Sequence, residues 1–211
     1  MKIIKVKNLK EAVISASLFL PKNNALNNFI ALTGGRFGNQ LLEHIKSKEL
    51  NIGSWFIYQT DERVLCHKRD VIQNKIVSSL CNCQGFSLEN LNFFSYEKDY
   101  LKRLQILEKK TEQMPDRSLD LCFLSLGQDG HLAGHFKNSE ILGNKFCVTI
   151  DAPKKPKTRV SYSVSWLKKS KKIVLVCIGK EKEKVLNELI NGTGLHSEIM
   201  ENNNLYIITN N

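Results

Sequence analysis

The segment Leu121–His131, with the sequence LCFLSLGQDGH, decides the fold class. Six apolar or small residues follow Asp120, and such a run predicts a β-strand that is covered on both faces. The run ends in a turn where Gly127 and Gly130 flank an aspartate and His131 follows. In an open α/β sheet, loops at the carboxyl ends of strands line the ligand crevice. This turn is therefore the first candidate for chemistry, although alone it suits a surface histidine equally well.

Two other segments have the same build. The apolar run Phe29–Thr33 leads into Gly34–Gly38 (GGRFG), and Trp55–Tyr58 leads into Gln59–Arg63 (QTDER). Three strand-like runs thus end in residues suited to holding an anion, orienting polar groups and moving a proton. Their coincidence favours a functional site over three unrelated turns.

Strand-like and helix-like segments alternate along the rest of the chain. We expect further strands at residues 2–6, 146–150, 160–164, 173–178 and 205–209. We expect one helix that ends before residue 21, a second that ends near residue 48, and three more at residues 70–80, 96–112 and 180–190. This alternation predicts a single domain over residues 1–211, built as three α/β/α layers around a mostly parallel, Rossmann-like sheet.

The three strand ends resemble motifs of the 6-phosphogluconolactonase family, part of a larger group that includes glucosamine-6-phosphate deaminases. Gly34–Gly38 stands where the family has a Gly-Gly-Ser-Thr-Pro loop, and Asp61–Arg63, with Asn74 further on, matches its Asp-Glu-Arg triplet. Gly127–Phe136 is similar to its Gly-x-Asp-Gly-His-Thr-Ala-Ser-Leu-Phe stretch, the most specific of these motifs.

The resemblance continues in order along nearly the whole chain. Pro153–Ser161 is similar to the family's proline-containing approach to an arginine-bearing strand, and Val174–Lys182 matches a strand followed by Gly-x-x-Lys. Leu195–Ile207 looks like the closing segment. The resemblance implies hydrolysis of 6-phospho-D-glucono-1,5-lactone to 6-phosphogluconate, a step of the oxidative pentose phosphate pathway, with no metal or organic cofactor.

The resemblance makes His131 the candidate general base that takes a proton from water, since an imidazole titrates near neutral pH. The alternative is a turn histidine bonded to the backbone. Asp129 has two possible roles, because its carboxylate can orient His131 or bind N–H groups of its own turn.

The substrate would be a small anionic sugar-phosphate lactone. Arg63 is the best ligand for an oxyanion, because a guanidinium can form two parallel bonds, unless it pairs with neighbouring Asp61 or Glu62. Arg159 and Lys182 are added by the resemblance and would otherwise be exposed charges. The backbone N–H groups of the glycine loop can cradle an anion. The expected substrate-binding residues are Gly34, Gly35, Arg36, Asp61, Arg63, Arg159 and Lys182.

The chain departs from the family pattern inside these motifs. Arg36, Phe37 and Gly38 replace Ser-Thr-Pro and so remove two hydroxyl groups. Backbone N–H groups at a helix start can still bind an anion, and Arg36 adds positive charge. Leu132 follows the histidine in place of threonine, and Gly134–His135 stands where Ser-Leu is usual.

Three alternatives remain open. A deaminase of the same fold would continue Asp-Gly-His with an Asn-Glu-Pro element, whereas Lys137–Ser139 stands here. The altered glycine loop suits a sugar-phosphate-binding protein without turnover. The formal net charge of +10 suits a nucleic-acid partner, but the lysines fall on expected solvated faces and no RNA-binding or zinc-finger motif accompanies them.

The cysteines and histidines do not form a recognisable metal site. The six cysteines include one close pair, Cys81 and Cys83, which lacks the second paired element of a zinc site. His131 and His135 have the spacing of two ligands on one helix face, without a convincing third ligand. We expect reduced thiols, a cytoplasmic location, no membrane-spanning segment and either a monomer or a homodimer.

Overall fold

The computed structural model describes residues 1–22 and 26–211. Its central layer is a seven-stranded sheet in the order β1-β11-β10-β6-β2-β3-β5, and each neighbouring pair is parallel. The strands are β1 (Lys2–Lys5), β2 (Asn28–Leu32), β3 (Trp55–Gln59), β5 (Leu91–Asn92), β6 (Leu121–Ser125), β10 (Ile173–Cys177) and β11 (Leu205–Thr209). The predicted mostly parallel α/β sheet is confirmed.

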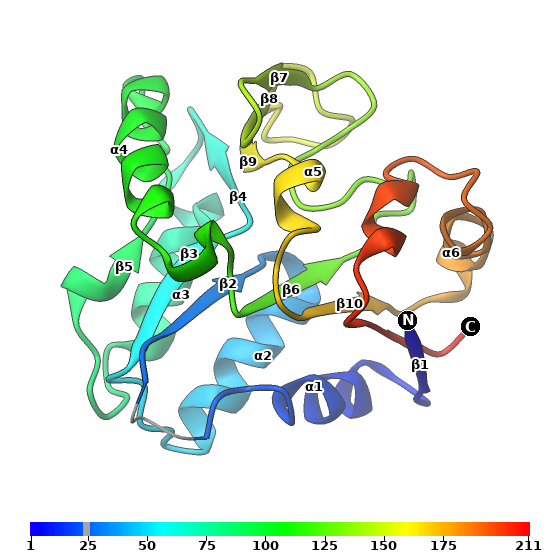
Figure 1. Cartoon of the computed structure of the whole chain (residues 1–211), viewed down its shortest axis with the longest axis horizontal. Coiled ribbons are helices and arrows are strands. Elements are labelled where there is room, and N and C mark those ends of the chain that lie inside the picture. Colours follow the sequence, from blue (N-terminus) through cyan, green and yellow to red (C-terminus); the bar gives the residue numbers. More distant parts are fainter. Residues whose placement is uncertain (23–25) are drawn as a thin grey trace.

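Helices cover both faces of this sheet (Figure 1). They are α1 (Leu9–Ser17), α2 (Gly35–Ser47) and α3 (Ile72–Leu80) on one face, and α4 (Tyr100–Glu112), α5 (Val164–Leu167) and α6 (Glu183–Ile190) on the other. Each face has its own hydrophobic core, because the side chains of a strand point alternately to the two sides. The three layers match the predicted arrangement.

Strand β6 shows why the apolar run that begins at Leu121 indicates the fold class. Leu121 and Phe123 pack in the core beneath α1 and α2, while Cys122 and Leu124 pack in the core on the side of α4 and α6. Each of these side chains is at most 3% exposed. A strand buried on both faces needs apolar residues at every position. Because β6 is the middle strand of the sheet, the turn that follows it lies at the middle of the carboxyl edge.

A second sheet stands above the first, and the sequence did not predict it as a separate unit. Its strands are β4 (Asp61–Val64), β7 (Glu140–Leu142), β8 (Phe146–Thr149) and β9 (Thr158–Tyr162), in the antiparallel order β4-β9-β8-β7. The Asp-Glu-Arg triplet was expected in a turn after β3, and it forms β4 instead. Figure 1 shows β7 and β8 at the outer end of this small sheet.

Several helix boundaries differ from the expectations. The helix predicted from residue 96 begins at Tyr100, because Ser95 donates a hydrogen bond to the Asp99 carboxylate (2.6 Å) in a turn that precedes it. The helix predicted from residue 180 starts as the 3₁₀ turn Lys180–Lys182 and becomes α-helical at Glu183. Further 3₁₀ turns are Lys68–Asp70, Leu88–Asn90, Pro115–Arg117 and Ser197–Glu201. The helices of residues 1–22 and 26–211 are too short or too polar to cross a bilayer.

Candidate active site

A pocket of about 350 Å³ lies between the carboxyl ends of β2 and β6 and the small sheet. Most of the residues predicted to form the site line it together: Gly34, Gly35, Asp61, Arg63, Asp129, His131 and Arg159. They come from four segments that are far apart in the sequence and meet only in the folded chain.

His131 and Asp129 form a bonded pair inside this pocket. His131 Nδ1 contacts the Asp129 carboxylate oxygen Oδ1. The carboxylate accepts, so Nδ1 carries the hydrogen, and Nε2 is left with the lone pair that a base needs. The hydrogen bond from His131 holds the pKa of the Asp129 carboxyl below its usual value, against the effect of partial burial, and backbone N–H groups of the same turn add to the lowering. Asp129 thus contacts both His131 and N–H groups of its own turn.

Gly127 leaves the space that this pair occupies. A Cβ at position 127 would run into the His131 ring and would lie 2.8 Å from Oδ1 of Asp129. The turn is closed by hydrogen bonds from Gly127 N–H to the His131 carbonyl (2.9 Å) and from Gly130 N–H to the Gly127 carbonyl (3.2 Å). Gly130 adopts φ +82°, a conformation that favours glycine. The glycines of the motif therefore fix the position of the imidazole.

Phe136 contacts the face of the His131 imidazole. Its ring stacks on His131 with the centroids 4.2 Å apart and the planes inclined by 24°. Phe136 also lines the pocket. The sequence identifies Phe136 only as the end of the motif, because a stack between residues five positions apart depends on the path of the loop.

Arg63 and Arg159 face each other across β4 and β9, where they are direct partners in the register. Arg63 Nη1 donates to the Asp70 carbonyl (3.0 Å), and Arg159 Nη2 donates to the Lys154 carbonyl (3.3 Å). Arg159 is 7% exposed, and among the described residues its Nη1 has no hydrogen-bond partner. Burial lowers the pKa of the Arg159 guanidinium, which the nearby Asp61 carboxylate opposes.

Two like charges opposite each other in a sheet are destabilising, and a buried donor without a partner adds to that cost. An anion held between the two guanidinium groups would offset the repulsion between them and would accept a hydrogen bond from the unpaired donor. The alternative of an ion pair with Asp61 or Glu62 is not seen for Arg63 in the described residues. The arrangement is therefore chemically suited to binding an oxyanion.

Glu62 has a structural role between these residues. Its carboxylate accepts hydrogen bonds from Gln59 Nε2 (2.7 Å) and from the N–H groups of Ile72 and Gln73 (each 2.8 Å). Burial raises the pKa of Glu62, and these hydrogen bonds oppose the rise. A carboxylate at the first turn of α3 is favourable to the helix dipole. Glu62 thus ties β4 to α3 and fixes the backbone from which Arg63 projects.

Arg36 and Lys182 lie outside this pocket, unlike the rest of the predicted set. They line a neighbouring hollow of about 200 Å³ beside Gly179 and Glu181. Arg36 Nη2 is 3.9 Å from Glu181 Oε1, and its side chain is 80% exposed. Arg36 projects from the first turn of α2 toward the end of β10, so its position on the helix separates it from Arg63 and Arg159.

The pocket is also lined by basic residues for which the sequence predicts a solvated surface. Lys154 and Lys155 line it next to Pro153, together with Thr33 and Gln128. Their position four and five residues before Arg159 was the available signal. The loop before β9 therefore adds positive charge to the wall that carries the arginine pair.

The described residues contain no group of three His, Cys, Asp or Glu side chains arranged to hold a metal ion. His131 and His135 do not share a helix face, because the chain from Gly127 to Ser139 forms turns and single β-bridges. Each ring has its own partners: Asp129 for His131, and the Val164 N–H for His135.

Among known structures, the 6-phosphogluconolactonase from Trypanosoma cruzi superposes with a TM-score of 0.84 at 20% identity, covering 99% of this chain and 93% of that one. A monomeric glucosamine-6-phosphate deaminase gives a TM-score of 0.82 at 13% identity, covering 99% of this chain and 97% of that one. Both enzyme classes share this fold, so the likeness shows the architecture.

Among curated proteins, the probable 6-phosphogluconolactonase 2 of Oryza sativa subsp. indica is 25% identical over 177 residues, which cover 75% of this chain and 63% of the rice protein. The chain thus spans less than two thirds of that relative. The 6-phosphogluconolactonase of Chlamydia pneumoniae is 23% identical over 199 residues, which cover 90% of this chain and 74% of the bacterial protein. The model of a family described as glucosamine-6-phosphate isomerases/6-phosphogluconolactonase matches residues 14–202, and the chain belongs to that family.

Proposed function

We propose that this protein hydrolyses 6-phospho-D-glucono-1,5-lactone to 6-phosphogluconate, as a step of the oxidative pentose phosphate pathway. The observation that carries the proposal is the Asp129–His131 pair in a pocket whose opposite wall holds paired arginines. Curated relatives named 6-phosphogluconolactonase support the choice of reaction within the family. We further propose that the chain acts as a single domain in the cytoplasm, without metal or organic cofactor.

In the proposed reaction, Nε2 of His131 takes a proton from water while the water oxygen attacks the lactone carbonyl carbon. The bond from that carbon to the ring oxygen then breaks, and the ring oxygen takes the proton from the imidazolium to become a hydroxyl group. Asp129 keeps Nε2 free before the reaction and stabilises the imidazolium between the two steps. The carboxylic acid formed loses its proton to solvent.

Substrate phosphate would be held on the wall that carries Arg63 and Arg159. The partnerless Nη1 of Arg159 supports this assignment, because a phosphate oxygen would supply the missing acceptor. Gly34 and Gly35 open α2, so their N–H groups add the positive end of a helix dipole. Arg36 and Lys182, in the adjoining hollow, would contribute longer-range attraction. Remote binding of this kind fixes the lactone carbon near the base.

The pocket lining favours hydrolysis over deamination. Its acidic residues are Asp61 and Asp129, and no glutamate is among the described residues that line it. Lys137 and Asn138, which stand where a deaminase would have its Asn-Glu-Pro element, are exposed. Glu140 lies on β7 and is also exposed.

The proposal is tested by giving the purified protein two substrates in parallel. We expect acceleration of 6-phosphogluconolactone hydrolysis above the spontaneous rate and no release of ammonia from glucosamine 6-phosphate. Ammonia release without lactone hydrolysis would establish the deaminase instead. Binding of 6-phosphogluconate without either reaction would identify a sugar-phosphate-binding protein.

A further inference from the structure

The loop that follows His131 has little regular structure and is held by side chains. Gly134 N–H donates to Ser161 Oγ (3.1 Å), and Thr149 Oγ1 donates to the Gly134 carbonyl (3.1 Å). Phe136 N–H donates to Ser139 Oγ (2.7 Å). Strands β8 and β9 thus fix one side of the loop, just before the residue whose ring stacks on His131.

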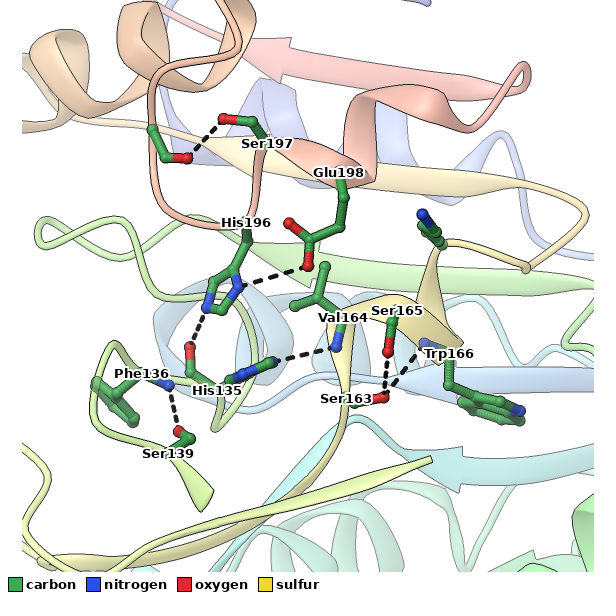
Figure 2. Close-up of polar contacts among 12 residues, drawn as sticks. His135, Phe136, Ser139, Ser163, Val164, Ser165, Trp166, His196, Ser197 and Glu198 are labelled. Carbon is green, nitrogen blue, oxygen red and sulfur yellow. Dashed lines mark hydrogen bonds and ion pairs between the residues drawn. The ribbon is translucent and has the colours of Figure 1, made fainter. Parts of the chain in front are cut away.

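Two histidines fix the other side. His196 Nε2 donates to the His135 carbonyl (2.8 Å), and His135 Nδ1 accepts from the Val164 N–H (3.2 Å). The two imidazole rings lie against each other, with centroids 4.1 Å apart. Figure 2 shows His196 descending onto His135 from the segment before Ser197, while Val164 approaches the His135 ring from α5. The pair therefore joins the loop to α5 and to the C-terminal part of the chain.

The hydrogen bonds assign one tautomer to each ring. A carbonyl only accepts, so His196 carries its hydrogen on Nε2. An N–H only donates, so His135 has a bare Nδ1 and carries its hydrogen on Nε2. Burial lowers the pKa of His135 to about 4, with a further contribution from His196, and burial also lowers the pKa of His196. His135 is therefore neutral near pH 7, as the hydrogen bond that its Nδ1 accepts requires.

His196 is held in place on its own segment. It is 7% exposed and has φ +64°, a left-handed conformation that is uncommon outside glycine. On the same segment, Ser197 Oγ donates to the Gly194 carbonyl (2.6 Å). A residue keeps such a backbone conformation only where its surroundings determine it. The ring is thus directed at His135 by the local fold.

We propose that His135 and His196 are positioning residues for His131. The path is short: His196 holds the His135 carbonyl, the next residue is Phe136, and the Phe136 ring lies flat on the His131 imidazole. The pair holds the Phe136 ring in its stack on His131 and thereby keeps His131 bonded to Asp129, with Nε2 toward the pocket. The inference rests on the proposed function in that it assigns the pair a task in the same reaction.

The test uses substitutions that keep or remove a single hydrogen bond. His196→Gln retains a donor near the Nε2 position, whereas His196→Leu removes it at similar volume. His135→Asn retains an acceptor near the Nδ1 position, whereas His135→Leu removes it. Lys137→Ala, at an exposed position of the same loop, is the matched control. Each variant is followed by thermal unfolding, by kcat and KM for the lactone, and by the proton resonance of His131 Cε1–H.

The resonance reports the stack directly, because the Phe136 ring current shifts a proton that lies over its face. We expect His196→Leu and His135→Leu to move it downfield and to lower kcat about tenfold, with KM within about twofold, since misplacing a catalytic group affects chemistry more than binding. His196→Gln, His135→Asn and Lys137→Ala should retain the wild-type resonance and kcat. If either leucine variant unfolds, His196→Asn, whose amide is too short to reach the carbonyl, replaces it with the same expected losses.

Wild-type resonance and kcat in folded His196→Leu and His135→Leu would overturn the proposal. A loss in His196→Gln equal to that in His196→Leu would also overturn it, because the hydrogen bond would then not be what matters. If the wild type lacks lactonase activity, the proposed reaction fails, but the resonance still decides whether the pair positions His131.

Discussion

Arg63 and Arg159 are direct cross-strand partners on β4 and β9, so two positive charges share one position of the small sheet. Strand pairs normally place opposite charges or apolar side chains opposite each other. This destabilising pair of like charges lies at the edge of the pocket, next to Lys154 and Lys155. Such an arrangement is stabilised by an anion that binds between the two side chains.

Replacing Arg159 with methionine should separate binding from folding. The substitution removes a buried donor and a like charge opposite Arg63, so the Tm of the ligand-free protein should stay the same or rise. Loss of a charge-assisted hydrogen bond, about 2 kcal/mol, should raise KM about 30-fold. Thermal unfolding with and without inorganic phosphate checks this, since phosphate should raise the Tm of the wild type but not that of Arg159→Met. Arg69→Met, on an exposed side chain, is the control, and an unchanged KM in Arg159→Met would refute the assignment.

Alanine at position 127 should displace the His131 imidazole. Its Cβ would occupy space taken by the His131 ring. We expect kcat to fall about 100-fold, the size of effect that follows a displacement of about 1 Å. Gly53→Ala is a suitable control, because its Cβ would meet nothing closer than 3.3 Å and the site is remote from the pocket. Normal turnover in Gly127→Ala would show that His131 does not need its observed position.

The Asp129 carboxylate should contribute stability in a defined pH range. Its pKa is lowered in the folded protein, chiefly by the hydrogen bond from His131. A carboxyl with a lowered pKa stabilises the fold above its unfolded pKa of about 3.9, and this contribution is lost as the pH falls through the folded value. The Tm difference between the wild type and Asp129→Asn should therefore be steady above about pH 5 and shrink below about pH 4. A difference that grows in acid would contradict this.

Glu62 should matter for stability rather than for binding. Glu62→Gln places an amide NH₂ among groups that already donate, namely the N–H groups of Ile72 and Gln73 and the Gln59 amide. We expect a loss of about 2 kcal/mol in the free energy of unfolding, measured by urea denaturation. Glu89→Gln, on an exposed side chain, should change it by less than about 0.5 kcal/mol. Equal stability of the two variants would show that the buried carboxylate is not an anchor.

The central sheet could be predicted because its strands carry their own signal. Leu121–Leu124 is apolar at every position since both faces are buried, and the glycines after it mark the turn. The small sheet carries no such signal. Strand β4 consists of Asp61–Val64, three charged residues and a valine, and its partner β9 lies almost a hundred residues later. Pairing over that distance is decided by the tertiary fold.

The same distinction applies to the site. His131, Asp129 and Arg63 were found from local motifs, and they line one pocket. Arg36 was grouped with them because it follows the glycine pair, but its place on α2 directs it to the neighbouring hollow. The part played by His196 depends on a contact with His135, 61 residues earlier, which no local pattern encodes.

The most direct test of the account compares the wild type with His131→Ala in hydrolysis of freshly generated 6-phosphogluconolactone, each measured above the spontaneous rate. We expect clear acceleration by the wild type and at least a 100-fold smaller acceleration by the variant, roughly the contribution of a general base. Equal acceleration by the two proteins would contradict the role of His131, and no acceleration by the wild type would contradict the proposed reaction itself.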